Sequence, residues 1–196
     1  MQTVGVVLAG GRATRMGGGD KGALMLDGRP LLTRCIDRLA PQVDRIVLNA
    51  NGDPARFAQY GLDVVGDSIP GFAGPLAGVL AGMDWAAEQG ATSVISVAVD
   101  TPFFPQDLVK QLQASGPLAL AATPDPVHKP NRHPTFGLWP VALRADLRAA
   151  LGSGLRKVVM WTERHGASTV LFPVGRFDPF FNINTPEDLT AAEALL

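Results

Sequence analysis

The chain has 196 residues, and its 17 lysine and arginine residues nearly balance 18 aspartate and glutamate residues, for a formal net charge of −1. A chain of this length can form one medium domain with a substantial core and needs no metal or disulfide cross-link for stability. The balanced charge, with no dense basic stripe, argues against a dedicated nucleic-acid-binding protein, and the short apolar runs argue against a membrane-spanning one.

The cellular location is predicted from the N-terminus and the cysteine content. The N-terminal residues show no signal-type cleavage pattern. Cys35 is the only cysteine and has no partner for an internal disulfide. We therefore expect a cytoplasmic protein, with Cys35 buried as a small apolar residue.

Short runs rich in Val, Ile and Leu alternate along the chain with longer segments of helical periodicity, which is typical of a βα order. The predicted strands are residues 4–8, 45–48, 62–65, 93–99, 118–122, 135–138 and 169–172. The predicted helices are residues 30–39, 78–88, 105–113, 140–151, 155–165 and 186–195. Most strands are apolar on both faces, so we expect a three-layer α/β fold with a central, mostly parallel sheet. The proline-rich stretch 123–134 predicts a long loop rather than a linker, so residues 1–196 are read as one domain.

The first predicted strand runs into a glycine-rich loop that carries three cations. Residues 10–22 read GGRATRMGGGDKG and include Arg12, Arg15 and Lys21. Glycines let the backbone approach a ligand closely, and the cations can neutralise phosphate charge. A dinucleotide fingerprint would begin at the strand end, and a Walker A loop needs Ser or Thr after Lys21, so neither motif fits. The loop predicts a phosphate site of another kind, with a mobile loop of solvated charges as the alternative.

Polar residues lie at the ends of three predicted strands. Asp100 follows the long apolar run 93–99, Asn49 ends the second strand, and Asp67 follows the third. In an open α/β sheet these positions face the ligand crevice, where a carboxylate suits Mg²⁺. The alternative for Asp100 is a helix cap, and for Asn49 and Asp67, each taken singly, it is a turn residue.

Two further groups of residues are candidates for ligand binding. Gly74, Pro75 and Leu76 precede a helix whose N-terminal amides can face a ligand, although a simple tight turn gives the same pattern. The second group lies in the C-terminal half, after Asp100, and comprises His133, Arg156, Lys157, Asn182 and Asn184. Asn182 and Asn184 share one face if their segment is extended, whereas asparagines in a loop would bond their own backbone.

The segments LAGG at 8–11, RMG at 15–17 and DKG at 20–22 resemble the triphosphate loop of nucleotidyltransferases that activate a phosphorylated acceptor. Within these enzymes the chain is most similar to the molybdenum cofactor guanylyltransferases. The further matching segments, in chain order, are VLNAN at 47–51, GDSIPGFAGPLAG at 66–78, AVDTPFFP at 98–105, HPTFGLW at 133–139 and FNINTPEDL at 181–189. The resemblance therefore covers essentially the whole chain.

This resemblance implies a Rossmann-like nucleotidyltransferase fold that transfers GMP from GTP to the phosphate of molybdopterin, with Mg²⁺ as cofactor. It implies catalytic roles for Arg15, Lys21 and Asp100, with Asp100 as the metal ligand. The N-terminal half would bind the nucleotide through Leu8, Ala9, Gly10, Gly11, Lys21, Asn49, Asp67, Gly74, Pro75, Leu76 and Asp100. The C-terminal half would bind the acceptor through His133, Arg156, Lys157, Asn182 and Asn184.

Three alternatives stay open on the sequence alone. The same fold could serve a molybdopterin cytidylyltransferase or a sugar-phosphate nucleotidyltransferase, because spacing alone does not select the base or the acceptor. The third alternative is a cofactor carrier without catalysis, against which the retained Lys21 and Asp100 argue. We expect a monomer, with the molybdenum insertase and molybdoenzyme-specific chaperones as further partners.

Overall fold

The computed structural model describes residues 2–10, 20–69, 71 and 74–196. Its main element is a seven-stranded sheet in the order β5-β4-β1-β6-β8-β7-β9. The strands are β1 (Thr3–Leu8), β4 (Arg45–Asn49), β5 (Asp63–Val65), β6 (Ser93–Ala98), β7 (Ala119–Thr123), β8 (Asn131–Pro140) and β9 (Ser168–Leu171). Only β8 runs against its neighbours, since it pairs antiparallel with β6 and β7 while the other pairs are parallel. The predicted α/β fold with a mostly parallel sheet is confirmed.

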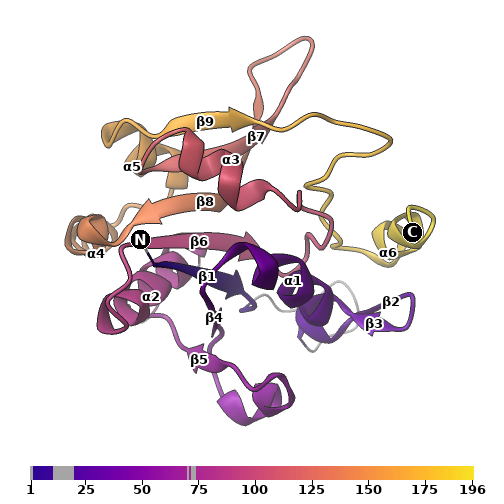
Figure 1. Cartoon of the computed structure of the whole chain (residues 1–196), viewed down its shortest axis with the longest axis horizontal. Coiled ribbons are helices and arrows are strands. Elements are labelled where there is room, and N and C mark those ends of the chain that lie inside the picture. The colour runs from indigo at the N-terminus through magenta and orange to yellow at the C-terminus, as the bar shows by residue number, and fades with distance from the viewer. Residues whose placement is uncertain (1, 11–19, 70, 72–73) are drawn as a thin grey trace.

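Helices cover both faces of the sheet (Figure 1). One face packs against α1 (Leu31–Leu39) and α3 (Leu108–Ala114), and the other packs against α2 (Pro75–Glu88), α4 (Arg144–Gly152) and α5 (Val158–Arg164). Strand β1 shows why: Val7 packs with the first set of helices, while Val4 and Val6 pack with the second. This alternation along one strand, apolar on both faces, is the pattern that predicted the three layers.

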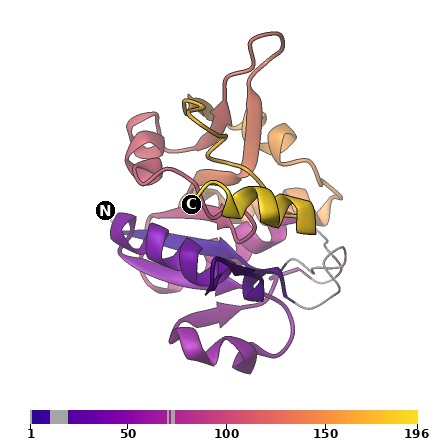
Figure 2. The same cartoon turned by 90° about the vertical axis from the view of Figure 1, so that its right-hand side faces the viewer.

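A smaller third cluster lies beyond the carboxyl ends of the strands. Helix α6 (Pro186–Glu193) packs there against the hairpin of β2 (Met25–Leu26) and β3 (Arg29–Pro30), and Figure 2 shows it in yellow across that side of the molecule. Its buried residues are Leu26, Leu31, Phe103, Ile183 and Ala192. The hairpin was not predicted, although Asp27 and Gly28 at its turn, with φ of 46° and 70°, form the Asp-Gly pair that favours such a turn.

Short 3₁₀ segments join these elements: η2 (Lys21–Ala23), η3 (Ala40–Gln42), η4 (Pro54–Tyr60) and η5 (Val141–Leu143). Among the described residues, no helix combines the length and apolarity that a bilayer crossing requires. Helix α2 begins at Pro75, a turn before the predicted start, because proline fits the first helical position.

The predicted loop 123–134 is wrong in extent. Strand β7 continues to Thr123 and β8 starts at Asn131, with Ala121 opposite His133 and Thr123 opposite Asn131. Only the turn between the two strands, residues 124–130, projects from the sheet (Figure 1). The polar residues at the start of β8 misled the prediction because they pair with the buried end of β7 without an apolar pattern of their own.

Candidate functional site

Three parallel strands of the sheet end side by side and bring predicted site residues to one edge. The backbone N–H of Ala9 donates to the Asn49 carbonyl at 2.9 Å, and that of Val99 donates to the Leu8 carbonyl at 3.3 Å. These bonds continue the pairing of β1 with β4 and β6 by one residue. Leu8, Ala9, Asn49 and the turn leading to Asp100 therefore share the edge where α/β proteins bind ligands.

Lys21 lies at the centre of this edge. Its Nζ is 2.9 Å from Asp100 Oδ2 and also donates to Asn184 Oδ1. The Lys21 and Asp100 side chains are only 16% and 21% exposed. The structure thus joins three predicted residues from distant parts of the sequence in one charged cluster, here called the Lys21 cluster: Lys21, Asp100 and Asn184.

The backbone beside Lys21 is held by close packing. A Cβ atom added to Gly22 would lie 3.1 Å from Leu32 Cβ and 3.3 Å from Val99 Cγ2. Glycine at this position therefore lets the segment lie tightly between α1 and the end of β6. Gly11, Arg12 and Arg15, which were also predicted to act in this loop, lie outside the described residues.

The segment 182–185 is anchored to the same edge through both backbone and side chains. The N–H of Ile183 donates to the Asp100 carbonyl at 2.8 Å, and the Thr101 hydroxyl donates to Asn182 Oδ1. Asp188 Oδ2 accepts the backbone N–H groups of Asn184 and Thr185, each at 2.9 Å. These donors lower the pKa of Asp188, and the charge of Lys21 acts in the same direction.

A second polar group lies at the ends of β4 and β5. Asn49 Nδ2 donates to Asp67 Oδ1 at 3.1 Å, and Asn51 Nδ2 donates to Asp67 Oδ2 at 2.9 Å. The Asn51 side chain also accepts the backbone N–H of Asp67 at 2.8 Å. The convergence expected for Asn49 and Asp67 is present, and Asn51 completes it.

Helix α2 begins beside this second group. Gly74 is its N-cap and Pro75 its first residue, and a Cβ on Gly78 one turn later would lie 2.2 Å from Asn49 Oδ1. Leu76 is buried, so only its backbone can face a ligand. No described residue lies within 4 Å of a Cβ atom added to Gly10, at the end of β1, so none of them blocks a ligand from approaching the backbone there.

A pocket of about 470 Å³ has Asn182 in its lining. The Thr101 hydroxyl contacts both Asn182 Oδ1 and Asp100 Oδ1, and so connects this pocket to the Lys21 cluster. The His133 ring stacks on Phe180 with centroids 4.3 Å apart, and His133 Nε2 is 3.1 Å from the Thr123 hydroxyl. Burial lowers the pKa of His133, with a smaller opposing effect from Asp178. We call this the aromatic pocket, lined by Asn131, Arg132, His133, Pro134, Thr135, Phe136, Asp178, Phe180, Phe181 and Asn182.

Arg156 and Lys157, the two predicted acceptor cations, do not line the aromatic pocket. Both are exposed at the start of α5, where Lys157 is the N-cap and Arg156 donates to the Leu155 carbonyl. Of the five predicted acceptor residues, the structure therefore brings His133 and Asn182 to the pocket and Asn184 to the Lys21 cluster.

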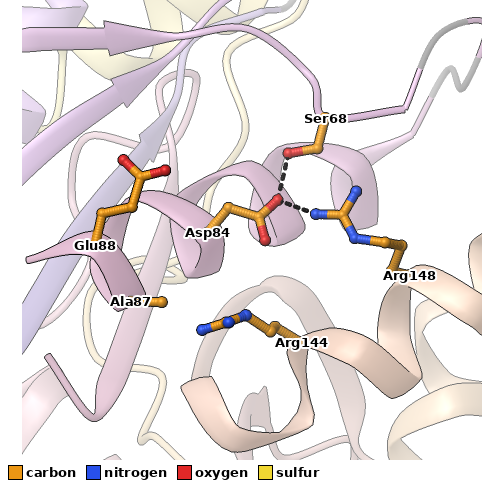
Figure 3. Close-up of a pocket in the computed structure, with 6 residues that line it drawn as sticks. All are labelled: Ser68, Asp84, Ala87, Glu88, Arg144 and Arg148. Atoms are coloured by element: carbon orange, nitrogen blue, oxygen red, sulfur yellow. Dashed lines mark hydrogen bonds and ion pairs between the residues drawn. The ribbon is translucent and has the colours of Figure 1, made fainter. Parts of the chain in front are cut away.

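A separate pocket of about 600 Å³ lies between α2 and α4 and contains none of the predicted residues (Figure 3). In it, the Asp84 carboxylate accepts from the Ser68 hydroxyl at 2.6 Å and from the Arg148 guanidinium. Ser68 follows Asp67 of the second polar group. The bonds of Asp84 therefore attach the segment after Asp67 to both α2 and α4.

Sequence reasoning missed four residues that hold the site together. Asn51, Thr101 and Asp188 lie inside segments that carried the family resemblance, and their polar side chains near strand and helix ends were the available signal. Arg56 gave no such signal. It forms an ion pair with Asp20 at 3.1 Å and donates to the Asn51 carbonyl, which links the lysine-bearing loop to the end of β4.

The donors near Asp100 fit one kind of metal site. Carboxylate and amide oxygens are hard ligands, and the described residues contain no group of three or more His, Cys, Asp or Glu side chains that could hold an ion. Mg²⁺ needs only one or two protein carboxylates when substrate phosphates and waters supply the rest. The cluster therefore fits an Mg²⁺ ion that binds together with a phosphorylated ligand.

Comparison with known proteins gives consistent results. The family of MobA-like NTP transferase domains matches residues 5–167. A molybdenum cofactor guanylyltransferase from Bradyrhizobium sp. (strain ORS 278) is 56% identical over 199 residues, which cover 97% of this chain and 92% of the relative.

Two solved structures share the fold. Molybdopterin-guanine dinucleotide biosynthesis protein A from Archaeoglobus fulgidus matches with a TM-score of 0.72 and 24% identity, covering 99% of this chain and 98% of that one. The 4-diphosphocytidyl-2C-methyl-D-erythritol synthase from Anaerococcus prevotii DSM 20548 matches with a TM-score of 0.76 and 16% identity, covering 99% and 95%. These likenesses establish the Rossmann-like nucleotidyltransferase fold.

Proposed function

The chain belongs to the family of molybdenum cofactor guanylyltransferases, and we propose that it transfers GMP from GTP to the phosphate of molybdopterin. The products are molybdopterin guanine dinucleotide and pyrophosphate. The observation that carries this proposal is the Lys21 cluster at the ligand-binding edge of the sheet, within a chain of this family.

The reaction is a single displacement at phosphorus. An oxygen of the acceptor phosphate attacks the α-phosphorus of GTP, the bond from that phosphorus to the bridging oxygen breaks, and pyrophosphate leaves with its electron pair. The attacking phosphate is already an anion, so no general base is needed. Alignment of the reactants and neutralisation of charge are sufficient sources of catalysis.

Lys21 and Asp100 have complementary roles in this proposal. The ammonium group of Lys21 stabilises the triphosphate and the leaving pyrophosphate, and we assign the same role to Arg15 from the sequence. Asp100 would hold Mg²⁺, which when bound polarises the α-phosphate and shields its charge. The ion pair between Lys21 and Asp100 places both side chains at the same point of the ligand-binding edge.

The guanine nucleotide would lie along the ends of β1, β4 and β5. Asn49 and Asp67 offer amide and carboxylate groups to ribose or base, and from the sequence we assign further contacts to main-chain groups of residues 8–11 and 74–76. The amide network of Asn49, Asp67 and Asn51 supports this assignment because it holds the side chains rigidly at the crevice.

The aromatic pocket is the best place for the pterin of the acceptor. The His133 ring lines it and is backed by the buried Phe180 ring, and Asn182 connects the pocket to Asp100 through Thr101. Burial favours the uncharged form of His133, which suits contact with a neutral ring system. Arg156, Lys157 and Asn184 would then serve the acceptor's phosphate end.

We also propose that the protein works as a cytoplasmic monomer. In that setting it would take its acceptor from the molybdenum insertase and pass its product to molybdoenzyme-specific chaperones.

The test is product analysis with the purified chain, Mg²⁺, GTP and molybdopterin, using mass spectrometry to detect the guanine dinucleotide. We expect equal amounts of dinucleotide and pyrophosphate. Lys21→Ala and Asp100→Ala should each lower kcat by about a hundredfold or more, as removal of a charge-stabilising group does elsewhere. Lys110→Ala, which removes an exposed lysine of α3, is the matched control and should keep wild-type kcat. Near-wild-type turnover in either site variant would refute the role assigned to that residue.

A further inference from the structure

We propose that Asp188 is a positioning residue, which fixes Asn184 and through it holds the Lys21 ammonium beside Asp100. The catalytic consequence of this inference rests on the function proposed above. Asp188 forms no hydrogen bond with Lys21 or Asp100, so its hydrogen-bonded support of the cluster passes through the backbone of residue 184.

The geometry separates this role from ordinary helix capping. Asp188 is the third residue of α6 and forms a capping box with the N-cap Thr185, in which each side chain accepts the other's backbone N–H. The box needs only those two bonds. Asp188 Oδ2 accepts a further N–H from Asn184, which precedes the cap and lies outside the helix, at 2.9 Å.

That additional bond is one of several anchors on the segment that carries Asn184. Two others lie just before it: the N–H of Ile183 donates to the Asp100 carbonyl at 2.8 Å, and the Thr101 hydroxyl donates to Asn182 Oδ1. With the chain fixed on both sides, the Asn184 amide oxygen has a defined place, and there it accepts from Lys21 Nζ.

A lysine side chain needs such support to stay in one position. Its side chain has four rotatable carbons and a point charge with freely rotating donors, so holding it in one place costs much conformational entropy. Two acceptors, Asp100 Oδ2 and Asn184 Oδ1, restrict the ammonium more than one can. The carboxylate of Asp188 also adds a negative charge on this side of Lys21, which favours the same position of the ammonium.

The test compares Asp188→Ala with Thr185→Ala, a matched control that removes the other side chain of the capping box. Both variants lose helix capping, but only Asp188→Ala releases Asn184. The first readout is trace acetylation of lysines by acetic anhydride, quantified by mass spectrometry with the exposed Lys110 as internal reference. We expect Lys21 to be labelled several-fold faster in Asp188→Ala and Asn184→Ala than in the wild type and in Thr185→Ala.

The second readout is kcat in the transferase assay. Asp188→Ala should lose roughly ten- to a hundredfold, as small misplacements of catalytic groups do, while Thr185→Ala should stay within about twofold. Asp188→Asn keeps an acceptor oxygen for both N–H groups and should recover most of the loss. In an Asn184→Ala background, Asp188→Ala should cost little more, because both changes remove the same support.

The outcomes distinguish this inference from the function on which its catalytic part rests. Equal Lys21 labelling in Asp188→Ala and Thr185→Ala would overturn the positioning role. So would kcat losses in Asp188→Ala and Asn184→Ala that multiply in the double variant. An inactive wild type whose Lys21 labelling still separates these variants would refute the proposed transferase and uphold the positioning of Lys21.

Discussion

At the scale of single residues, two glycines of α2 decide how closely that helix approaches the sheet. A Cβ added to Gly82 would lie 2.2 Å from Val6 Cγ2, and one added to Gly78 would lie 2.2 Å from Asn49 Oδ1. Neither distance is compatible with a side chain, so the two positions require glycine for the observed packing. They differ in what they contact: Gly82 faces Val6 in the core, whereas Gly78 faces Asn49, a residue of the proposed nucleotide site.

This difference gives a paired prediction. Gly82→Ala and Gly78→Ala should each lower the free energy of unfolding by about 1–3 kcal/mol, because overpacking outweighs the better helix propensity of alanine. Only Gly78→Ala should also weaken GTP binding, by about tenfold, since displacing Asn49 costs hydrogen bonds worth roughly 1 kcal/mol each. Urea unfolding and calorimetric titration with GTP measure the two effects. Equal GTP affinities in the two variants would show that Asn49 is not displaced or does not bind the nucleotide.

Individual site residues could be predicted from the sequence where strand ends mark the crevice. Asp100, Asn49 and Asp67 follow apolar runs, and parallel strands end at one edge, so their shared location follows from the pattern. The partners of Lys21 could not be derived this way. The contact between Lys21 and Asn184 joins residues 163 positions apart, and no local pattern encodes it.

At the scale of elements, α4 and α5 are joined by one carboxylate. Asp146 Oδ1 accepts from Trp161 Nε1 at 2.8 Å and from His165 Nε2 at 2.7 Å. Trp161 is buried, and its indole N–H is satisfied by this bond. These two donors lower the pKa of Asp146, with the Trp161 contribution the larger.

The lowered pKa predicts a pH-dependent contribution to stability. A carboxyl whose pKa is lower in the folded state stabilises the protein above its ordinary pKa of about 3.9, and the contribution is lost as pH falls through the folded value. Asp146→Asn should therefore be less stable than wild type at pH 7, by less than about 1 kcal/mol because Asp146 is largely exposed. Thermal unfolding at pH 7 and at about pH 2.5 should show this gap closing in acid. A gap that is the same at both pH values would contradict the account of Asp146.

The elements themselves were predictable to different degrees. The strands that are buried on both faces were predicted correctly, because a short, continuous apolar run is typical of such a strand. Strand β8 was shortened in the prediction, since its first residues, Asn131, Arg132 and His133, are polar and show no alternation of apolar residues. The aromatic pocket was not predicted as a unit, because its two sides come from β8 and from the segment 178–182, which only the folded chain brings together.

At the scale of the whole molecule, the sheet and the third cluster build the site jointly. Strand β8 alone is reversed, so the strands on both sides of it end at the same edge. The chain after β9 then crosses this edge to reach α6, which packs on the β2–β3 hairpin (Figure 2). Residues 182–184 therefore meet Lys21 and Asp100 only in the complete fold, between the proposed nucleotide crevice and the aromatic pocket.

The central claim is that this arrangement transfers a guanylyl group to molybdopterin. The most direct measurement is pyrophosphate release with Mg²⁺ and molybdopterin, comparing GTP, CTP, ATP and UTP in parallel. We predict release with GTP and none above background with the other three nucleotides. Release with CTP alone would contradict the choice of base while keeping the proposed phosphate chemistry, and no release with any of the four would contradict the proposed function itself.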